Sequence, residues 1–214
     1  MSVKILLADD HKIMREGLAA LLEKQSGLTV VGEADNGRAA VRLARELSPD
    51  VVIMDISMPD LNGIEATRQI LAEAPGTKVI ALSMHSDRHF VRGMLKAGAS
   101  GYLLKHSASH ELIKAIQLVL AHRVYLSPDI TGIVVEDYKK PERDASIFAV
   151  LTPRELEVLQ LLAEGKSPRE IADTLHLGLK TVEAYRRQIA DKLGFKSFAE
   201  LVKYAIREGL VSLE

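Results

Sequence analysis

Short apolar runs recur along the first 124 residues and alternate with segments whose apolar side chains have helical spacing. The runs cover residues 3–8, 28–32, 51–54, 79–82 and 101–104, and continuous runs of this kind are typical of buried parallel strands. Between them, residues such as Met14, Leu18 and Leu22 share one helical face. Parallel neighbours need crossover connections, so the repeats predict an α/β doubly wound sheet of five parallel strands.

The pattern changes after residue 122, which predicts a second domain of a different class. Residues 123–150 mix Pro, Gly and charges of both signs, and we interpret them as an interdomain linker in which residues 130–135 could pack on either neighbouring domain. Residues 151–214 have only helical spacing, and capping boxes that begin at Thr152, Ser167 and Ser197 predict helix starts. We therefore expect domains at residues 1–122 and 151–214, the second being all-α. Its four helices are expected near residues 153–163, 168–175, 179–193 and 198–208.

Composition and charge restrict the function classes further. The 214 residues include no cysteine, which excludes disulfides and thiolate metal sites. The apolar run at the start is too short for a signal peptide or a membrane span, so we expect a cytoplasmic protein without a membrane partner. Residues 151–214 hold ten Lys or Arg and ten Asp or Glu, so the overall charge of this part does not indicate nucleic-acid binding.

Polar residues follow the predicted strands at their carboxyl ends. Asp9 and Asp10 follow the first strand, Asp55 the third, Ser83 the fourth and Lys105 the fifth. In a doubly wound sheet these ends lie at one edge, where ligands bind at the point at which the strand order reverses. We therefore expect the five side chains to converge, although each alone would be an ordinary cap or surface residue.

Three carboxylates at one edge require a compensating cation. Two of them about 4 Å apart repel by roughly 4 kcal/mol at an effective dielectric constant near 20. Mg2+ prefers oxygen ligands and completes its coordination with water or phosphate oxygens. A carboxylate beside such a metal can attack phosphorus, while Lys105 and Ser83 would contact the resulting anion. We interpret His11 as a polar surface residue.

The stretches "ADDH", "DISMPDLNG", "LSMH" and "GYLLK" resemble the receiver domain of two-component response regulators, which has a flavodoxin-like fold. By this resemblance, Asp55 accepts a phosphoryl group from a histidine kinase. The implied Mg2+ ligands are Asp9, Asp10, Asp55 and the backbone carbonyl of Ser57. The implied phosphate-contacting and switch residues are Lys105, Ser83 and Tyr102.

Residues 151–194 contain two predicted helices joined by a short turn at residues 176–178, an arrangement typical of a helix-turn-helix. On the second of these helices, Val182, Ile189 and Leu193 share the side expected to be buried. The residues left mostly outward are Lys180, Thr181, Glu183, Ala184, Arg187 and Lys192. A helical bundle that contacts protein instead of DNA is the alternative interpretation.

From Leu151 onward the sequence also resembles the LuxR-type DNA-binding domain of the NarL/FixJ subfamily. The resemblance implies binding of a homodimer to double-stranded DNA, with RNA polymerase as a further partner. It implies phosphate contacts by Lys180 and Thr181. It assigns base contacts to Glu183, Ala184 and Arg187. The apolar residues of the last helix could form core or a dimer surface, and the resemblance assigns Leu201, Tyr204 and Ala205 to dimerisation.

These features together predict a transcriptional response regulator, switched by phosphorylation of Asp55, that is not an enzyme. A metal-dependent phosphohydrolase with Asp55 as its nucleophile is the first alternative, but it would need a second acid as general acid–base and a substrate lid. The sequence offers neither of these features. A regulator whose receiver no longer accepts phosphate is the other alternative.

Overall fold

The chain divides into two units in the computed structural model, Met1–Glu142 and Arg143–Glu214. The structure describes residues 2–84, 86–139, 147–195 and 197–211. Residues 140–146 of the predicted linker and residues 212–214 of the predicted second domain lie outside the described residues. Among the described residues, no helix is long and apolar enough to cross a membrane.

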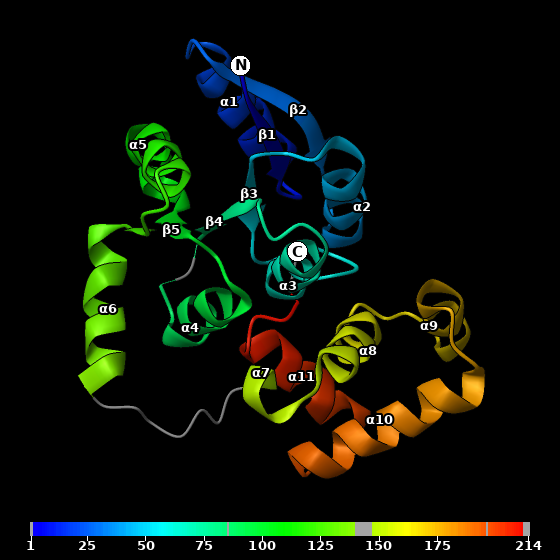
Figure 1. Ribbon diagram of the computed structural model, residues 1–214. Helices are drawn as coiled ribbons and strands as arrows, with labels where there is room; N and C mark the ends of the chain where they lie inside the picture. Colours follow the sequence, from blue (N-terminus) through cyan, green and yellow to red (C-terminus); the bar gives the residue numbers. More distant parts are fainter. Residues whose placement is uncertain (1, 85, 140–146, 196, 212–214) are drawn as a thin grey trace. The chain divides into compact units, whose positions relative to one another are not determined.

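A parallel sheet forms the centre of the first unit, with strand order β2-β1-β3-β4-β5-β6 (Figure 1). The strands are β1 (Val3–Ala8), β2 (Leu28–Ala34), β3 (Val51–Asp55), β4 (Lys78–Ser83), β5 (Gly101–Leu104) and β6 (Tyr125–Leu126). The order reverses between β1 and β3, as in flavodoxin-like sheets. The predicted doubly wound fold is therefore confirmed, and each of the five predicted strands is present.

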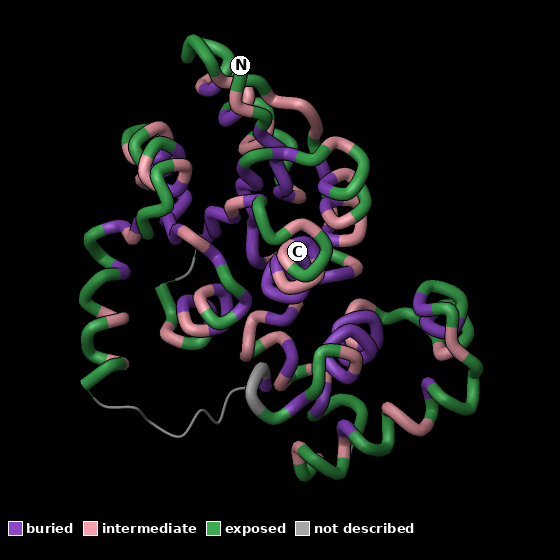
Figure 2. Tube along the Cα trace, viewed as in Figure 1, coloured by how far each residue is buried: buried purple, intermediate pink, exposed green. Residues whose placement is uncertain are grey.

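Helices cover both faces of this sheet. They are α1 (Lys12–Glu23), α2 (Gly37–Leu47), α3 (Gly63–Glu73), α4 (Arg88–Ala97), α5 (Ala108–Leu120) and α6 (Pro128–Lys139), with a short 3-10 helix, η1, at Lys105–Ser107. Helices α1 and α5 lie on one face, where Leu18, Leu22 and Ile116 pack against strand residues such as Ile5 and Ile53. The neighbouring helices α2, α3 and α4 cover the other face (Figure 1). Strands β1, β3, β4 and β5 are consequently buried along most of their length (Figure 2), whereas most residues of β2 are half-buried or exposed.

The interpretation of residues 123–150 as a linker is wrong for residues 125–139. Tyr125 and Leu126 form β6, a sixth strand that pairs with β5. Helix α6 follows, contacts α4 and buries Ile130 completely. A two-residue strand leaves almost no periodic signal, and the stability of α6 depends on contacts with α4 that are distant in sequence, so the local pattern did not reveal either element.

The second unit is helical throughout its described residues. Its elements are α7 (Ile147–Val150), α8 (Pro153–Ala163), α9 (Pro168–Leu175), α10 (Leu179–Leu193) and α11 (Phe198–Arg207). The four predicted helices are confirmed, and α7 is an additional short helix within the predicted linker. Complete capping boxes start α8 at Thr152 and α9 at Ser167, and the Ser197 side chain accepts a hydrogen bond at the start of α11. The core contains Leu156, Leu159, Ile171, Val182, Ile189 and Leu201.

Candidate functional site

An acidic cluster lies where the strand order of the sheet reverses. Asp9 and Asp10 directly follow β1, and Asp55 is the last residue of the neighbouring strand β3. Side-chain ligand atoms of Asp9, Asp10, His11 and Asp55 all lie within 4.8 Å of one another. Asp9 and Asp55 are buried, so water does little to screen their repulsion. The predicted convergence of the three carboxylates is therefore found.

Lys105 provides a positive charge inside this cluster. The residue follows β5 at the start of η1, and its side chain is buried. Its Nζ atom lies 2.7 Å from Asp9 Oδ2 and 2.8 Å from Asp55 Oδ2. Burial alone would lower the pKa of Lys105, but its contacts with Asp55 and Asp9 raise that pKa overall. Lys105 therefore remains charged and links the carboxylates of two strands.

The Asp55 carboxyl group is the most perturbed acid of the cluster. Burial raises its pKa, Lys105 lowers it and the charge of Asp9 raises it again, with a net value of about 7. Its Oδ1 atom accepts a hydrogen bond of 2.7 Å from the Ile56 amide, which fixes the orientation of the carboxyl group. One lysine thus does not compensate the site fully, and a further cation would favour ionised Asp55.

Asp10 and His11 complete the part of the cluster nearest to solvent. Among the described residues, no donor forms a hydrogen bond with the buried Oδ1 atom of Asp10. The imidazole Nδ1 atom of His11 lies 2.8 Å from that oxygen, although His11 is exposed, as expected from the sequence. The ligand atoms of the cluster are mostly carboxylate oxygens, and an oxygen-rich set of ligands suits Mg2+. The residues present therefore fit a divalent cation.

The loop after β3 folds back tightly against Asp55. The Gly63 amide donates a hydrogen bond of 2.8 Å to the Ile56 carbonyl. A Cβ atom at Gly63 would lie 1.9 Å from the carbonyl oxygen of Asp55, so only glycine fits there. Ser57 lies within this loop and is half-buried. The role of its carbonyl as a metal ligand stays a prediction.

Arg15 is a residue of the site that the sequence analysis missed. From α1, its Nη1 atom donates hydrogen bonds to the carbonyl oxygens of Asp9 at 2.6 Å and Asp10 at 3.3 Å. Its Nε atom contacts Glu33 of β2 at 3.3 Å. Arg15 therefore holds the backbone that presents both acids. The signal for this role in the sequence is weak: an arginine one helical turn after "DDH".

Ser83 and Tyr102, the predicted switch pair, are joined by a side-chain hydrogen bond. Ser83 ends β4 and Tyr102 lies in the neighbouring strand β5. The Tyr102 ring is completely buried, and this burial is the main cause of a raised pKa of its hydroxyl group. Tyr102 therefore occupies an inward position, in contact with the residue that ends the adjacent strand.

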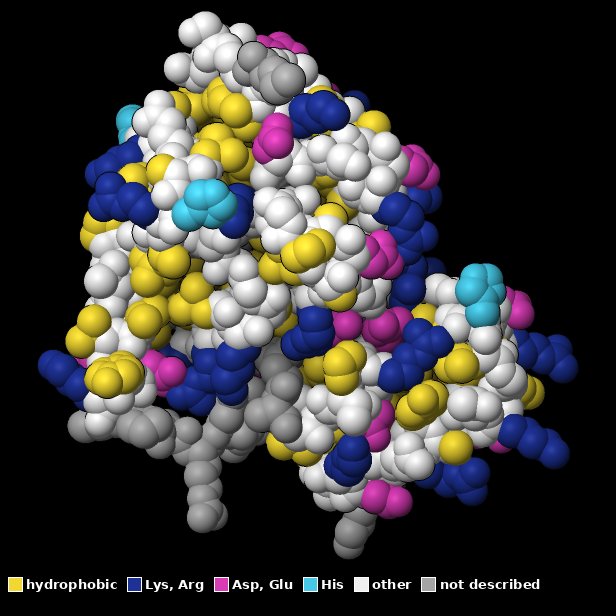
Figure 3. Space-filling view, viewed as in Figure 1, with side chains coloured by type: hydrophobic (Ala, Val, Ile, Leu, Met, Phe, Trp, Pro, Cys, Tyr) yellow, Lys and Arg dark blue, Asp and Glu magenta, His cyan; other side chains and the backbone are white. Residues whose placement is uncertain are grey.

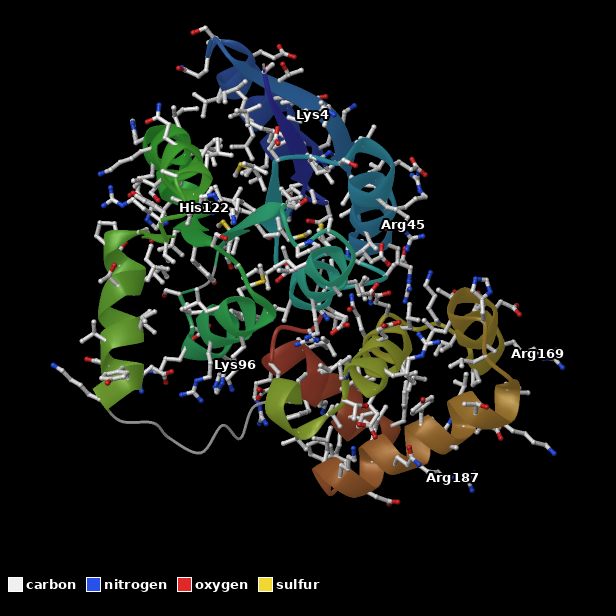
Figure 4. The ribbon with its side chains drawn as sticks, in the orientation of Figure 1. Lys4, Arg45, Lys96, His122, Arg169 and Arg187 are labelled. Atoms are coloured by element: carbon white, nitrogen blue, oxygen red, sulfur yellow. The ribbon has the colours of Figure 1, made fainter. Side chains whose placement is uncertain are left out.

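The helix-turn-helix of the second unit consists of α9, a turn and α10. His176 ends α9 with a left-handed backbone (φ 52°), and Gly178 is the N-cap of α10. Val182 and Ile189 face the core. The predicted DNA-contacting residues Lys180, Thr181, Glu183 and Arg187 are exposed, and Ala184 is half-buried. Basic side chains project from this unit in Figure 3, and Figure 4 shows Arg187 pointing away from α8.

Lys192 has a partner inside the domain, contrary to its predicted place among the DNA contacts. Its Nζ atom lies 2.7 Å from Glu155 Oε2, a buried carboxylate at the start of α8. Burial raises the pKa of Glu155, but bonds from Lys192 and Thr152 lower it overall. Lys192 therefore connects α10 to the capping box of α8.

The predicted dimerisation residues need a larger correction. Leu201 and Ala205 belong to the core of the second unit, so neither is available to a partner chain. Tyr204 is half-buried, with its ring centroid 5.0 Å from that of Phe195 and with Arg207 over its face. Helical spacing identified the apolar face of α11 correctly but did not reveal that the protein's own core covers it.

Residues 5–117 match the response regulator receiver domain, and residues 149–205 match the luxR family of bacterial regulatory proteins. Response regulator GacA of Pseudomonas syringae pv. syringae is 39% identical over 209 residues, which cover 98% of each chain.

Two solved structures of RcsB response regulators are also similar over nearly the whole chain. One is RcsB from Salmonella enterica serovar Typhimurium, bound to promoter rprA with the phosphomimetic BeF3-. It is 28% identical with a TM-score of 0.65, and the match covers 95% of this chain and 98% of that one. The other contains two RcsB dimers bound to two parallel DNAs, with 28% identity, a TM-score of 0.60 and the same coverage.

Proposed function

This chain belongs to the response regulators of two-component systems that join a receiver domain to a LuxR-type DNA-binding domain, and we propose that phosphorylation of Asp55 controls its binding to DNA. Proteins of this family are DNA-binding regulators rather than enzymes. The observation that carries the proposal is the position of Lys105, which contacts Asp9 and Asp55 within a buried acidic cluster. Such a centre attracts a divalent cation together with a phosphoryl group.

The proposed reaction transfers a phosphoryl group from a phosphohistidine of a sensor histidine kinase to Asp55. A carboxylate oxygen of Asp55 forms a bond to phosphorus while the bond from phosphorus to the kinase imidazole nitrogen breaks. The proposed holders of Mg2+ are Asp9, Asp10, Asp55 and the Ser57 carbonyl; when bound, the ion would neutralise charge on the phosphoryl oxygens. Lys105 would then exchange its contact with the Asp55 carboxylate for one with the phosphoryl group.

The Ser83–Tyr102 pair is the proposed reader of this modification. Ser83 is the last residue of β4, the strand that pairs with β3. Its hydroxyl group would therefore lie close to a phosphoryl group on Asp55. A hydroxyl can donate one hydrogen bond to phosphate while it accepts another from the Tyr102 hydroxyl. The inward position of Tyr102 supports this arrangement. A change at Asp55 would thereby alter the packing of β4, β5 and the adjacent α4.

Helix α10 is the proposed reader of double-stranded DNA. Lys180 and Thr181 at its amino end would contact phosphates, and Glu183, Ala184 and Arg187 would face base edges in the major groove. An Arg that pairs bidentately with guanine contributes about 1–3 kcal/mol of discrimination. The exposure of Lys180, Thr181, Glu183 and Arg187 and the similarity to DNA-bound RcsB support the assignment. Lys192 is left out because it pairs with Glu155.

Dimers are the proposed DNA-binding species, with an interface that differs from the one expected. Phe198, Val202 and Ile206 form an apolar stripe on α11 at four-residue spacing, and Phe198 is half exposed. The RcsB structure with dimers on DNA supports a dimeric state. We propose this stripe as the contact between DNA-bound copies, in place of Leu201 and Ala205. RNA polymerase is the further proposed partner, and the proposed site of action is the cytoplasm.

One experiment tests this function. The full chain and Asp55→Asn are incubated with acetyl phosphate and Mg2+, and mass, oligomeric state and DNA retention are measured in parallel. We expect the wild-type protein alone to gain the mass of one phosphoryl group, to dimerise and to bind DNA more tightly. Absence of the mass gain, or an equal gain in both proteins, would overturn the proposal. A phosphorylated protein with unchanged DNA affinity would support a regulator that does not use its receiver.

A further inference from the structure

Helix α6 is attached at its start to the backbone of the switch residue Tyr102. Strand β6 pairs with β5, with Leu126 opposite Tyr102. The Ser127 amide then donates a hydrogen bond of 3.0 Å to the Tyr102 carbonyl. The carbonyl of Ser127 accepts the first hydrogen bonds of the helix, from Ile130 and Thr131. A displacement of the Tyr102 backbone therefore moves the first turn of α6 directly.

Helix α4 is attached to the other member of the switch pair. Ser83 ends β4, and only residues 84–87 separate it from Arg88, the first residue of α4. The side chains of Ser83 and Tyr102 are hydrogen-bonded to each other. Helices α4 and α6 thus follow, along the chain, two residues that are hydrogen-bonded to each other, and the two helices also contact one another (Figure 1).

Two ion pairs connect the first two turns of α4 to the last turn of α6. Arg88 Nη2 lies 2.6 Å from Glu136 Oε2, and both side chains are largely exposed. Arg92 contacts both carboxylate oxygens of Asp137, through Nε and Nη2, and this pair is mostly buried. A bidentate Arg–carboxylate contact holds a defined geometry as well as charge. The Arg92–Asp137 pair therefore sets the position of α6 on α4.

Apolar packing between the two helices is incomplete. A groove of about 300 Å3 separates them, lined by Val91, Leu95, Ile133 and Val134 with the charged residues around it. Ile130 is the one fully buried residue within α6, whose described residues are otherwise exposed or half-buried (Figure 2). An element with few buried apolar contacts can change position at low cost in free energy. The ion pairs, rather than a packed core, hold α6 in place.

From these contacts we propose that α4 and α6 form a clamp that transmits the state of the Ser83–Tyr102 pair to the chain leading into the DNA-binding unit. The proposal rests on the proposed function, because it concerns how phosphorylation of Asp55 is communicated. The switch pair joins the strand residues that precede the two helices, and the Arg88–Glu136 and Arg92–Asp137 pairs join the start of α4 to the last turn of α6. A shift at the switch pair moves both helices together, and α6 carries the movement to residue 139, where it ends.

The test separates phosphorylation from its effect. Full-length Asp137→Asn and Glu136→Gln/Asp137→Asn are treated with acetyl phosphate and Mg2+, and the phosphorylated fraction is measured by mass. The gain in DNA affinity on phosphorylation is then measured by titration. Coupling between sites is typically on the order of 5–150-fold in affinity. We expect both variants to be phosphorylated to the same extent as the wild-type protein. Their DNA affinity should, however, rise little or not at all on phosphorylation. Glu46→Gln, which breaks an exposed pair on α2, is the matched control.

Charge reversal provides the decisive comparison. In Arg92→Asp alone, phosphorylation should no longer increase DNA affinity. In Arg92→Asp with Asp137→Arg, much of the increase should return, because the ion pair is restored with opposite polarity. A gain equal to that of the wild-type protein in the neutralised variants would overturn the clamp, as would loss without recovery in the reversed pair. If the wild-type protein is not phosphorylated, or if its DNA affinity does not rise on phosphorylation, the proposed function itself fails. That failure would be distinct from a failure of the clamp, which appears only in the variants.

Discussion

Arg15 and Asp9 are joined across the junction of β1 and α1, where Arg15 Nη1 donates a hydrogen bond of 2.6 Å to the Asp9 carbonyl. The same atom reaches the Asp10 carbonyl, and Glu33 orients the guanidinium from β2. A side chain from a helix thus holds the backbone of two proposed metal ligands. Contacts of this second layer are often as important to a metal site as its ligands.

We predict that Arg15→Gln weakens Mg2+ binding by about tenfold or more, since outer contacts of this kind typically contribute 10–100-fold in metal affinity. Calorimetric titration of the full chain with Mg2+ measures the effect. Arg42→Gln, which removes an exposed pair with Glu46 on α2, is the control and should bind as the wild-type protein does. Equal Mg2+ affinity in Arg15→Gln and wild type would show that the acids keep their positions without Arg15.

Asp55 gives the protein a pH-dependent stability. Its pKa is about 7 in the folded protein, against 3.8 for an unperturbed aspartate, with burial as the main cause. The folded state therefore holds a proton more tightly than the unfolded state between these values, so the stabilising contribution present at low pH is lost as pH rises toward 7. In EDTA at pH 8, Asp55→Asn should be more stable than wild type by about 2–4 kcal/mol.

Urea unfolding at pH 4 and pH 8 measures this difference, which should be nearly absent at the lower pH. Mg2+ should also reduce it at pH 8, because a cation favours ionised Asp55. Asp35→Asn, at an exposed position, should show neither effect. An advantage of Asp55→Asn that is the same at both pH values would contradict the assigned cause.

Substitution of two glycines by alanine should change the free energy of unfolding in opposite directions. The Cβ atom of Gly63→Ala would lie 1.9 Å from the Asp55 carbonyl oxygen, so the loop must shift, at a cost of about 1–3 kcal/mol. Gly17 lies in α1 with nothing within 4 Å of a Cβ atom, so Gly17→Ala should stabilise by up to about 1 kcal/mol. Urea unfolding compares the two. Equal effects would mean that the loop adjusts freely.

Lys192 and Arg187 both lie on α10, but we expect substitution of Lys192 to affect stability and substitution of Arg187 to affect DNA binding. Lys192→Gln removes the partner of buried Glu155 and should lower the free energy of unfolding by about 1–2 kcal/mol. Arg187→Ala should leave unfolding unchanged and weaken binding to the specific site by about 1–3 kcal/mol. Urea unfolding and DNA titration at several salt concentrations measure both. If Lys192→Gln reduces the salt dependence of DNA binding while stability is unchanged, Lys192 is a phosphate contact after all.

Local sequence patterns predicted most of the secondary structure because they act over short distances. The run at residues 51–54 became β3, and the capping boxes at Thr152 and Ser167 start helices where expected. The meeting of Asp9, Asp10 and Asp55 followed from topology, since carboxyl ends of adjacent parallel strands share an edge. These features need only periodicity and connectivity, both of which a sequence contains.

The features that the sequence did not reveal depend on side chains that meet across elements. Leu201 and Ala205 have the spacing of any apolar helix face, and only the packing of α11 against α8 decides that the core of the domain covers them. Lys192 is exposed, as its spacing predicts, but only the fold places its Nζ atom beside the buried carboxylate of Glu155. Spacing says which residues share a face, but it does not say what covers that face.

The sequence by itself determined the five central strands with their intervening helices, the four main helices of the second unit, and the residue types at the edge of the sheet. Tertiary structure alone decided that Lys105 contacts both Asp9 and Asp55, that Arg15 supports the acidic backbone, and that α6 is tied to α4. The physical reason is one of range. Backbone propensity and amphipathic periodicity act between near neighbours in the chain, whereas charge pairing and burial act between groups that only folding brings together.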